Sequence, residues 1–174
     1  MRLNFRNAVT FSLLIALSLA GTLARAQEKK AVKIRASAIQ VMMIRADEVT
    51  LPAEFQVSLY EQLINQLQKK RVFQHVYRDG DGTAATASDL IALQCTVADF
   101  KKGSETMRQV TTVAGATSIT LLCQFRNPAG TSLLDRRIEG KVQFFGGNLK
   151  ATYDFAKKAA NVAEENFSST AGGG

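Results

Sequence analysis

The hydrophobic positions in the first half of the chain change from a continuous run to a helical period. Residues 34–44 are mostly apolar and contain no glycine or proline, which favours a first strand. A helix then starts near Pro52, since proline is tolerated in a first turn. Its apolar stripe recurs every four residues and predicts about five turns: Phe55, Leu59, Leu63 and Leu67. A short strand is predicted over 72–77.

The second half of the chain shows a two-residue period and then a helical one. Apolar residues alternate with other residues over 90–100 and 118–126, which indicates two strands. A tight turn at 127–130 leads into a returning strand over 133–145. Four charged residues are expected on its outward face: Asp135, Arg137, Glu139 and Lys141. A last helix follows, with Asn148 as its cap and a stripe of Leu149, Tyr153, Ala156, Ala160, Ala163 and Phe167.

This order of elements predicts an α+β fold. We expect a mixed sheet of about five strands, in the order β-α-β-β-β-β-α, with two helices packed on one face. The first strand–helix–strand unit should be a parallel crossover and the last three strands an antiparallel meander. One domain is expected over 34–167, preceded by a flexible segment at 27–33 and followed by a disordered tail at 168–174.

Residues 1–26 have the pattern of a secretory signal peptide. Arg2 and Arg6 precede an apolar run over 8–20, and Ala24-Arg25-Ala26 is a small-x-small cleavage site. The run is too short to span a bilayer, which takes about 20 residues. We therefore predict an exported protein, periplasmic or secreted, that is soluble after cleavage near Ala26.

The net charge narrows the choice of partner. The chain has 22 Lys and Arg against 15 Asp and Glu, for a formal net charge of +7. Arg2, Arg6 and Arg25 lie in the signal segment, so the mature chain is only mildly basic. This charge favours anionic partners such as phospholipid headgroups or cell-wall polymers. The partner that we expect is an envelope protein or an anionic envelope polymer. Export and the scattered basic residues argue against nucleic acid.

Cys95 and Cys123 are the only two cysteines. Each lies on the apolar face of its predicted strand, and the two strands should pair as a hairpin. A hairpin centred between them places the two cysteines opposite one another, at a Cα separation close to that of a disulfide. The alternative is a pair of buried free thiols that act as small apolar residues.

No catalytic, cofactor or metal site is predicted. His75 is the single histidine, so a histidine-rich metal site is excluded, and no Gly-x-Ser-x-Gly elbow accompanies it. Asp79-Gly80-Asp81-Gly82 resembles the start of a calcium loop, but the twelfth position is Leu90, where an EF-hand needs glutamate. We interpret this segment as an acidic turn and His75 as a surface or structural residue.

The connection over 101–115 is the best candidate for a functional segment. It is longer than hairpin loops usually are, and such loops tend to be functional or disordered. It carries two lysines at its start and a Met-Arg pair near its centre, and these form the candidate partner-binding loop: Lys101, Lys102, Met107 and Arg108. The alternative is a flexible hairpin end.

Several weak motifs, taken in order, resemble one family. They are Phe73-x-x-Val76, Arg108 before Ala114-Gly115, Asn127-Pro128-Ala129-Gly130, Gly140, Gly146-Gly147 and the final helix ending Asn166-Phe167. This order is similar to the bacterial domain of unknown function 4410 family, exported proteins and lipoproteins with no established activity. The resemblance implies a lipoprotein ancestry for Leu19-Ala20-Gly21, but Thr22 stands where a lipobox has cysteine, so no lipid anchor can form.

Three functional hypotheses follow from the sequence. The first is a non-enzymatic interaction module of the cell envelope, which fits the signal, the long loop and the lack of a catalytic motif. The second is a small binding protein that holds an apolar or anionic ligand between helix and sheet. The third, an enzyme that uses carboxylates alone, is the least favoured.

Overall fold

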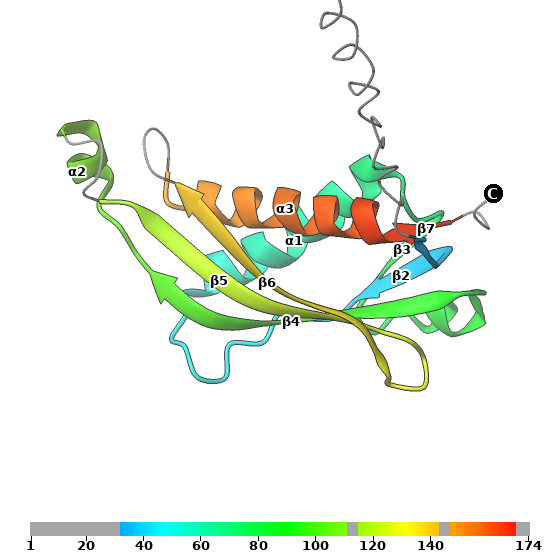
Figure 1. Ribbon diagram of the computed structural model, residues 1–174. Helices are drawn as coiled ribbons and strands as arrows, with labels where there is room; N and C mark the ends of the chain where they lie inside the picture. The colour runs from blue at the N-terminus through cyan, green and yellow to red at the C-terminus, as the bar shows by residue number, and fades with distance from the viewer. Residues whose placement is uncertain (1–31, 111–114, 143–146, 170–174) are drawn as a thin grey trace, which may run out of the picture. The chain divides into compact units, whose positions relative to one another are not determined.

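The computed structural model describes residues 32–110, 115–142 and 147–169. The predicted signal peptide and its cleavage site lie outside these residues. Within the described ranges, none of the helices is both long enough and apolar enough to cross a membrane. The described chain is α+β, with helices packed against a mixed sheet (Figure 1).

The main sheet has five strands in the order β3-β2-β4-β5-β6. Its strands are β2 (Ala38–Val41), β3 (His75–Arg78), β4 (Leu90–Lys101), β5 (Thr117–Arg126) and β6 (Ser132–Val142). β2 pairs in parallel with both β3 and β4, and β4, β5 and β6 pair antiparallel. The predicted parallel crossover and antiparallel meander are therefore both present.

The first predicted strand, 34–44, is divided in the structure. β1 (Ile34–Arg35) pairs in parallel with β7 (Phe167–Ser168) as a separate two-stranded sheet. The chain bends at Ser37, whose carbonyl accepts a hydrogen bond from Gln74 N–H, and then enters β2. Beyond β2, single contacts continue along β4, for example Met42 N–H to the Leu93 carbonyl at 3.0 Å. Residues of one apolar run thus belong to two different sheets.

Two long helices cover one face of the main sheet, α1 (Ala53–Lys70) and α3 (Lys150–Asn166). Ser58 Oγ lies 2.6 Å from Thr152 Oγ1, and Lys70 Nζ lies 2.5 Å from Glu164 Oε2. Both contacts join residues 94 apart in sequence, so the two helices run parallel and in step. A short helix, α2 (Glu105–Val110), and a 3₁₀ turn, η1 (Gly82–Thr86), add to the two expected helices.

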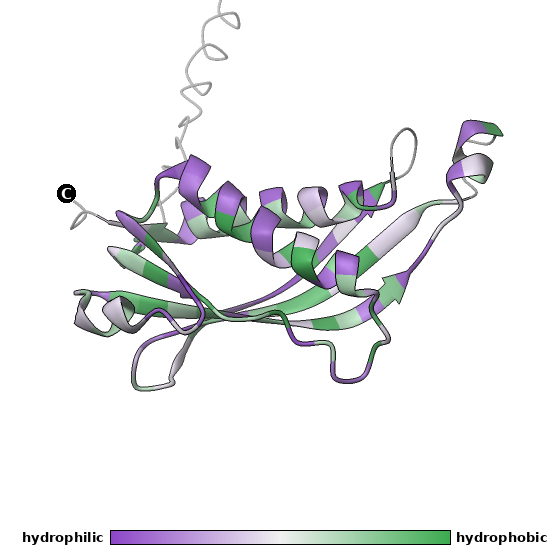
Figure 2. Ribbon diagram, turned by 180° about the vertical axis from the view of Figure 1, so that it is seen from behind, coloured by the Kyte–Doolittle hydropathy of each residue, from purple (hydrophilic) through white to green (hydrophobic). Residues whose placement is uncertain are grey.

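The core lies between these helices and the sheet. Alternate residues of β4 and β5 are buried, as the two-residue period predicts, and Figure 2 shows the hydrophobic colouring along these strands. Aromatic rings fill the layer: Phe125 and Phe167 lie 5.0 Å apart between ring centroids, and Phe55 and Phe100 lie 4.8 Å apart. The charged residues predicted for the outward face of the returning strand are exposed on β6.

The end of the chain departs from the expected pattern in two places. Asn148 does not cap the last helix with its side chain; Leu149 holds the N-cap position without a side-chain hydrogen bond among the described residues. At the other end, Ser168 belongs to β7 and pairs with Arg35, although the sequence predicts a loose tail there. Residues 170–174 of that predicted tail lie outside the described residues.

One buried polar group on α1 provides a stability prediction. Gln66 is 7% exposed, and its Nε2 is buried with no hydrogen-bond partner in the described part of the chain. A buried donor left unpaired costs about 1–3 kcal/mol. Replacing Gln66 with Met, which is similar in shape but apolar, is expected to raise the free energy of unfolding by about 1 kcal/mol. Chemical denaturation measures this, with Gln68→Met, at an exposed position of the same helix, as the control. Equal shifts for both variants would contradict the prediction.

Candidate interaction site on the β4–β5 arm

Two long paired strands, β4 and β5, carry a helix at their far end. β4 and β5 continue past the region where β2 and β3 pair, and the connection between them contains α2 (Figure 1). We call β4, α2 and β5 with their connection the arm. The sequence leaves open whether the connection is a partner-binding loop or a flexible end. Residues 105–110 of the connection form α2, and 111–114 lie outside the described residues.

The base of the arm is fixed by a chain of hydrogen bonds to the start of α3. Gly103 N–H donates to Thr117 Oγ1 at 3.0 Å, and that hydroxyl donates to Asn148 Oδ1 at 2.6 Å. Asn148 N–H in turn donates to Glu105 Oε1 at 3.0 Å. Thr117 is fully buried, so its two bonds are partly shielded from water, whereas the bond to Glu105 lies at the surface. The first residue of α2 is therefore held against the body of the domain.

Glycine is required at position 103 for this arrangement. A Cβ built on Gly103 would lie 2.0 Å from the Gly115 carbonyl oxygen and 2.4 Å from that of Ala116. Both contacts are to backbone atoms, which cannot rotate away as a side chain would. The two ends of the connection consequently approach one another closely below α2.

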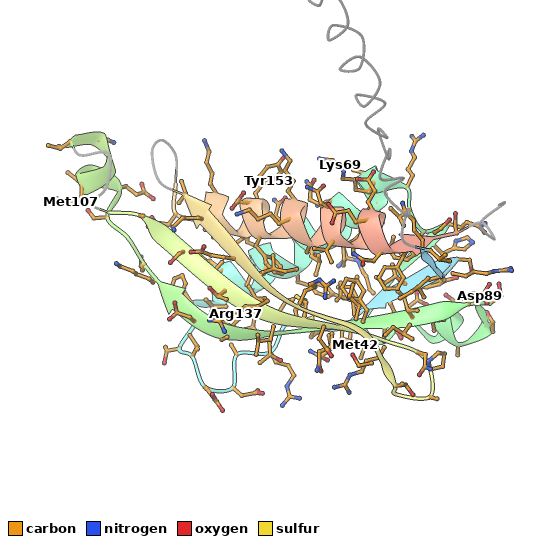
Figure 3. All side chains as sticks on the ribbon, in the orientation of Figure 1. Met42, Lys69, Asp89, Met107, Arg137 and Tyr153 are labelled. Atoms are coloured by element: carbon orange, nitrogen blue, oxygen red, sulfur yellow. A yellow bond between two sulfur atoms is a disulfide. The ribbon has the colours of Figure 1, made fainter. Side chains whose placement is uncertain are left out.

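The tip of the arm presents apolar side chains to solvent. Met107 is 45% exposed and Val110 is 78% exposed, although both are large hydrophobic residues. Figure 3 shows Met107 on α2, at the end of the arm. Ser104 Oγ accepts a hydrogen bond from Met107 N–H at 3.3 Å and so supports the first turn of α2. The tip is an exposed apolar surface on a fixed base.

The four residues of the predicted partner-binding loop lie on this arm. Lys101 is the last residue of β4, and Lys102 follows it; both are exposed. Met107 and Arg108 belong to α2, and the side chain of Arg108 lies outside the described part of the structure. The lysines are thus at the base of the arm and the methionine at its tip, and a role of these residues in partner binding stays a prediction.

Sequence reasoning missed the residues that fix the arm. It does not single out Glu105 or Thr117, and it assigns Asn148 to a helix cap. It also misses Val110, the most exposed apolar residue of the described tip. One local signal is available, because Ser104 followed by Glu105 is typical of a helix start. The bonds between Glu105, Thr117 and Asn148 join segments far apart in the chain and leave no periodic signal.

The acidic turn and the histidine have structural roles in the described residues. Asp81 accepts hydrogen bonds from the N–H and hydroxyl of Thr83, which hold the pKa of its carboxyl below the ordinary value. Asp79 accepts one from Met43 N–H at 2.9 Å. His75 is exposed on the edge strand β3, where its ring stacks on Tyr77 at 5.8 Å between centroids. These contacts give the acidic turn and His75 structural partners within the domain.

The remaining charged pairs are mostly at the surface. Glu61 accepts two hydrogen bonds from the Arg78 guanidinium, at 2.7 and 2.8 Å, and this pairing lowers the pKa of the Glu61 carboxyl. Arg35 pairs with Asp89 at 2.8 Å. Among the described residues, no three His, Cys, Asp or Glu side chains gather closely enough to hold a metal ion.

Cys95 and Cys123 form a disulfide in the structure. They are directly opposite in the β4–β5 ladder, and their Cα atoms are 4.1 Å apart. This short separation is typical of the non-hydrogen-bonded pairs of an antiparallel ladder. The hairpin centred between the cysteines, expected from the sequence, is therefore present, and of the two alternatives the structure has the bonded pair rather than free thiols.

Comparison with solved structures shows the fold. The PelC dodecamer from Paraburkholderia phytofirmans matches with a TM-score of 0.56 and 13% identity, over 77% of this chain and 91% of that chain. A variant of the same PelC dodecamer matches with a TM-score of 0.55 at the same identity and coverage. At this identity the likeness extends to the fold alone.

Among weaker likenesses is protein XCC0632 from Xanthomonas campestris, of the domain of unknown function 330 family. It has a TM-score of 0.44 and 11% identity, over 78% of this chain and 83% of that chain. By sequence, neither a protein-family model nor a curated protein matches the chain. The relation to the domain of unknown function 4410 family accordingly stays a resemblance.

Proposed function

We propose that this protein is an exported, non-enzymatic interaction module of the bacterial envelope, and that it binds a protein partner through the tip of the arm. The observation that carries the proposal is the exposure of Met107 and Val110 on a short helix whose first residue is hydrogen-bonded to Asn148, just before α3. A preorganised apolar tip loses little conformational freedom on binding, which favours recognition by a protein surface.

The packing of the domain supports recognition at the surface rather than inside. The rings of Phe73, Phe125 and Phe167 lie within 6.0 Å of their neighbours between the helices and the sheet. The ligand-binding hypothesis, with an apolar or anionic ligand held between helix and sheet, would need this space. A partner-binding tip needs no such space and uses residues that are already exposed.

Two further observations support export and assembly. The signal pattern at 1–26 predicts secretion, and the Cys95–Cys123 disulfide fits the oxidising compartments in which such bonds persist. The protein would then be periplasmic or secreted, and soluble after cleavage near Ala26. The PelC structures of similar fold are described as dodecamers, which is in keeping with a role in assembly.

Site-specific photocrosslinking tests the proposed tip. A photoreactive amino acid is placed at Met107, and the variant is crosslinked in intact cells that export it. It is expected to capture one specific envelope protein. The same amino acid at Val57, which is 60% exposed on α1, serves as the matched control and should not capture that protein. Capture of the same partner from both positions would contradict a binding site at the tip.

Substitutions distinguish a protein partner from an anionic polymer. Co-purification of the captured partner should be lost in the Met107→Gln, Val110→Asn double variant and kept in Val57→Asn. If Lys101→Gln, Lys102→Gln abolished retention on isolated cell envelopes while the double tip variant had no effect, the partner would be an anionic polymer. That outcome would overturn the proposed tip site.

A further inference from the structure

The edge strand β6 has a charge pattern that the proposed tip site does not use. β6 has eleven residues and is the outermost strand of the sheet beside β5, whereas the opposite edge strand, β3, has only four (Figure 1). A long open edge is a ready template for pairing with another strand. How its main-chain groups and its charges are arranged therefore decides what can pair there.

Main-chain groups of alternate β6 residues point away from β5. Lys141 N–H donates to Asp154 Oδ2 at 2.9 Å, and the Glu139 carbonyl accepts from Lys158 Nζ at 2.9 Å. Both partners are side chains of α3. Because direction repeats every two residues along a strand, the N–H and carbonyl of Arg137 point outward as well. The main-chain groups of the odd-numbered residues thus lie along the outer edge of β6, and α3 side chains bond those of Glu139 and Lys141.

The side chains of the same residues alternate in sign. Asp135, Arg137, Glu139 and Lys141 are all exposed and lie on the face away from the helices, where Figure 3 shows Arg137. A row of lysines would repel the edge of a second sheet, and lysine is a common protection of edge strands against such pairing. A regular alternation of acidic and basic residues instead favours pairing with a second copy. When two such strands run antiparallel, acidic residues of one can face basic residues of the other.

We propose that β6 pairs antiparallel with β6 of a second copy, across a twofold axis at Ile138. In this register Asp135 faces Lys141 of the other copy, and Arg137 faces its Glu139. Symmetry repeats both contacts, so four opposite-charge pairs form along one edge. The paired residues are the ones whose main-chain groups point outward, which satisfies the hydrogen-bonding pattern of an antiparallel ladder.

The charges select this register against its neighbours. A shift of the partner by one pair either way places Arg137 on Arg137 or Glu139 on Glu139, and like charges directly opposite destabilise a strand pair. A parallel, in-register pairing likewise sets each charge against itself. A shift of the partner by two pairs leaves two opposite-charge pairs in place of four. The alternation therefore specifies one arrangement of two copies.

The helix-facing side of the edge is compatible with this pairing. Arg136 is exposed although it points to the helix side, so α3 does not cover that part of β6. Asp154 and Lys158, which bond Lys141 N–H and the Glu139 carbonyl in the single copy, give way to main-chain partners.

A charge swap tests the register. Analytical ultracentrifugation of the purified oxidised protein, over a range of concentrations, is expected to show a monomer–dimer equilibrium that weakens with salt. Arg137→Glu places a glutamate opposite Glu139 in both symmetry-related pairs and is expected to raise the dissociation constant about tenfold or more. The double variant Arg137→Glu, Glu139→Arg restores all four opposite-charge pairs of this register and should recover dimerisation.

Lys157→Glu is the matched control, since it makes the same charge change on an exposed residue of α3. It should leave the dissociation constant unchanged, and circular dichroism should show every variant folded. A protein that stays monomeric at all concentrations would overturn the proposal and leave the edge to a foreign strand. A dimer that Arg137→Glu does not weaken, or that the double swap does not restore, would also overturn it.

Discussion

Replacing Gly140 with alanine is expected to destabilise the protein by about 3 kcal/mol, at the upper end of the usual cost of overpacking. A Cβ at this position of β6 would lie 2.1 Å from the Ala151 carbonyl oxygen and 2.6 Å from Phe155 Cβ. It would also lie 2.8 Å from the Phe155 main-chain nitrogen. The clash involves the backbone of α3, so relief requires the whole first half of that helix to move off the sheet.

Chemical denaturation followed by circular dichroism measures this loss. Gly82→Ala is the matched control, because no heavy atom of the described residues lies within 4 Å of a Cβ built there. That variant should be as stable as the original protein or slightly more stable, since alanine restricts the unfolded chain. If Gly140→Ala were no less stable than Gly82→Ala, the close approach of α3 to β6 would be wrong.

The fold class was predictable because it depends on local periods. The alternation over 90–100 and 118–126 appears in the structure as alternate burial along β4 and β5. The four-residue stripe of α1 likewise buries Phe55, Leu59, Leu63 and Leu67. Burial on one face is imposed at each residue, so it leaves a pattern that the sequence carries by itself.

What the sequence could not provide was the choice of partner for each segment. The apolar run 34–44 has the pattern of one strand, but Ile34 pairs with Phe167, which is distant in the chain. An apolar period records that a residue is buried and does not record which element buries it. The same limit explains the error at Asn148, a good helix cap by type, whose side chain instead accepts a hydrogen bond from Thr117.

The arm contains some features that the sequence predicts and others that it could not predict. The length of the connection after β4 and the presence of Met107 pointed to this segment, and its role in binding stays a prediction. The sequence could not decide between a flexible end and a fixed one, because that depends on Glu105 reaching Asn148 across the fold. Exposure of Val110 was equally hidden, since an apolar residue is expected to be buried until the structure shows otherwise.

Reducing the Cys95–Cys123 disulfide is expected to lower the free energy of unfolding by about 3–4 kcal/mol. The two residues are 28 apart in sequence, so the bond closes a long loop and removes much of the freedom of the unfolded chain. Both residues are almost fully buried. The loss should therefore appear as a lower denaturation midpoint with little change in the circular dichroism spectrum of the folded state.

Comparison of two perturbations separates the crosslink from the packing around it. Reduced wild-type protein keeps both sulfur atoms in the core, where thiols pack as small apolar groups, so its loss of stability reports the crosslink alone. The Cys95→Ala, Cys123→Ala double variant also removes buried volume and should be less stable than the reduced protein. Equal stability of oxidised and reduced protein would contradict the prediction.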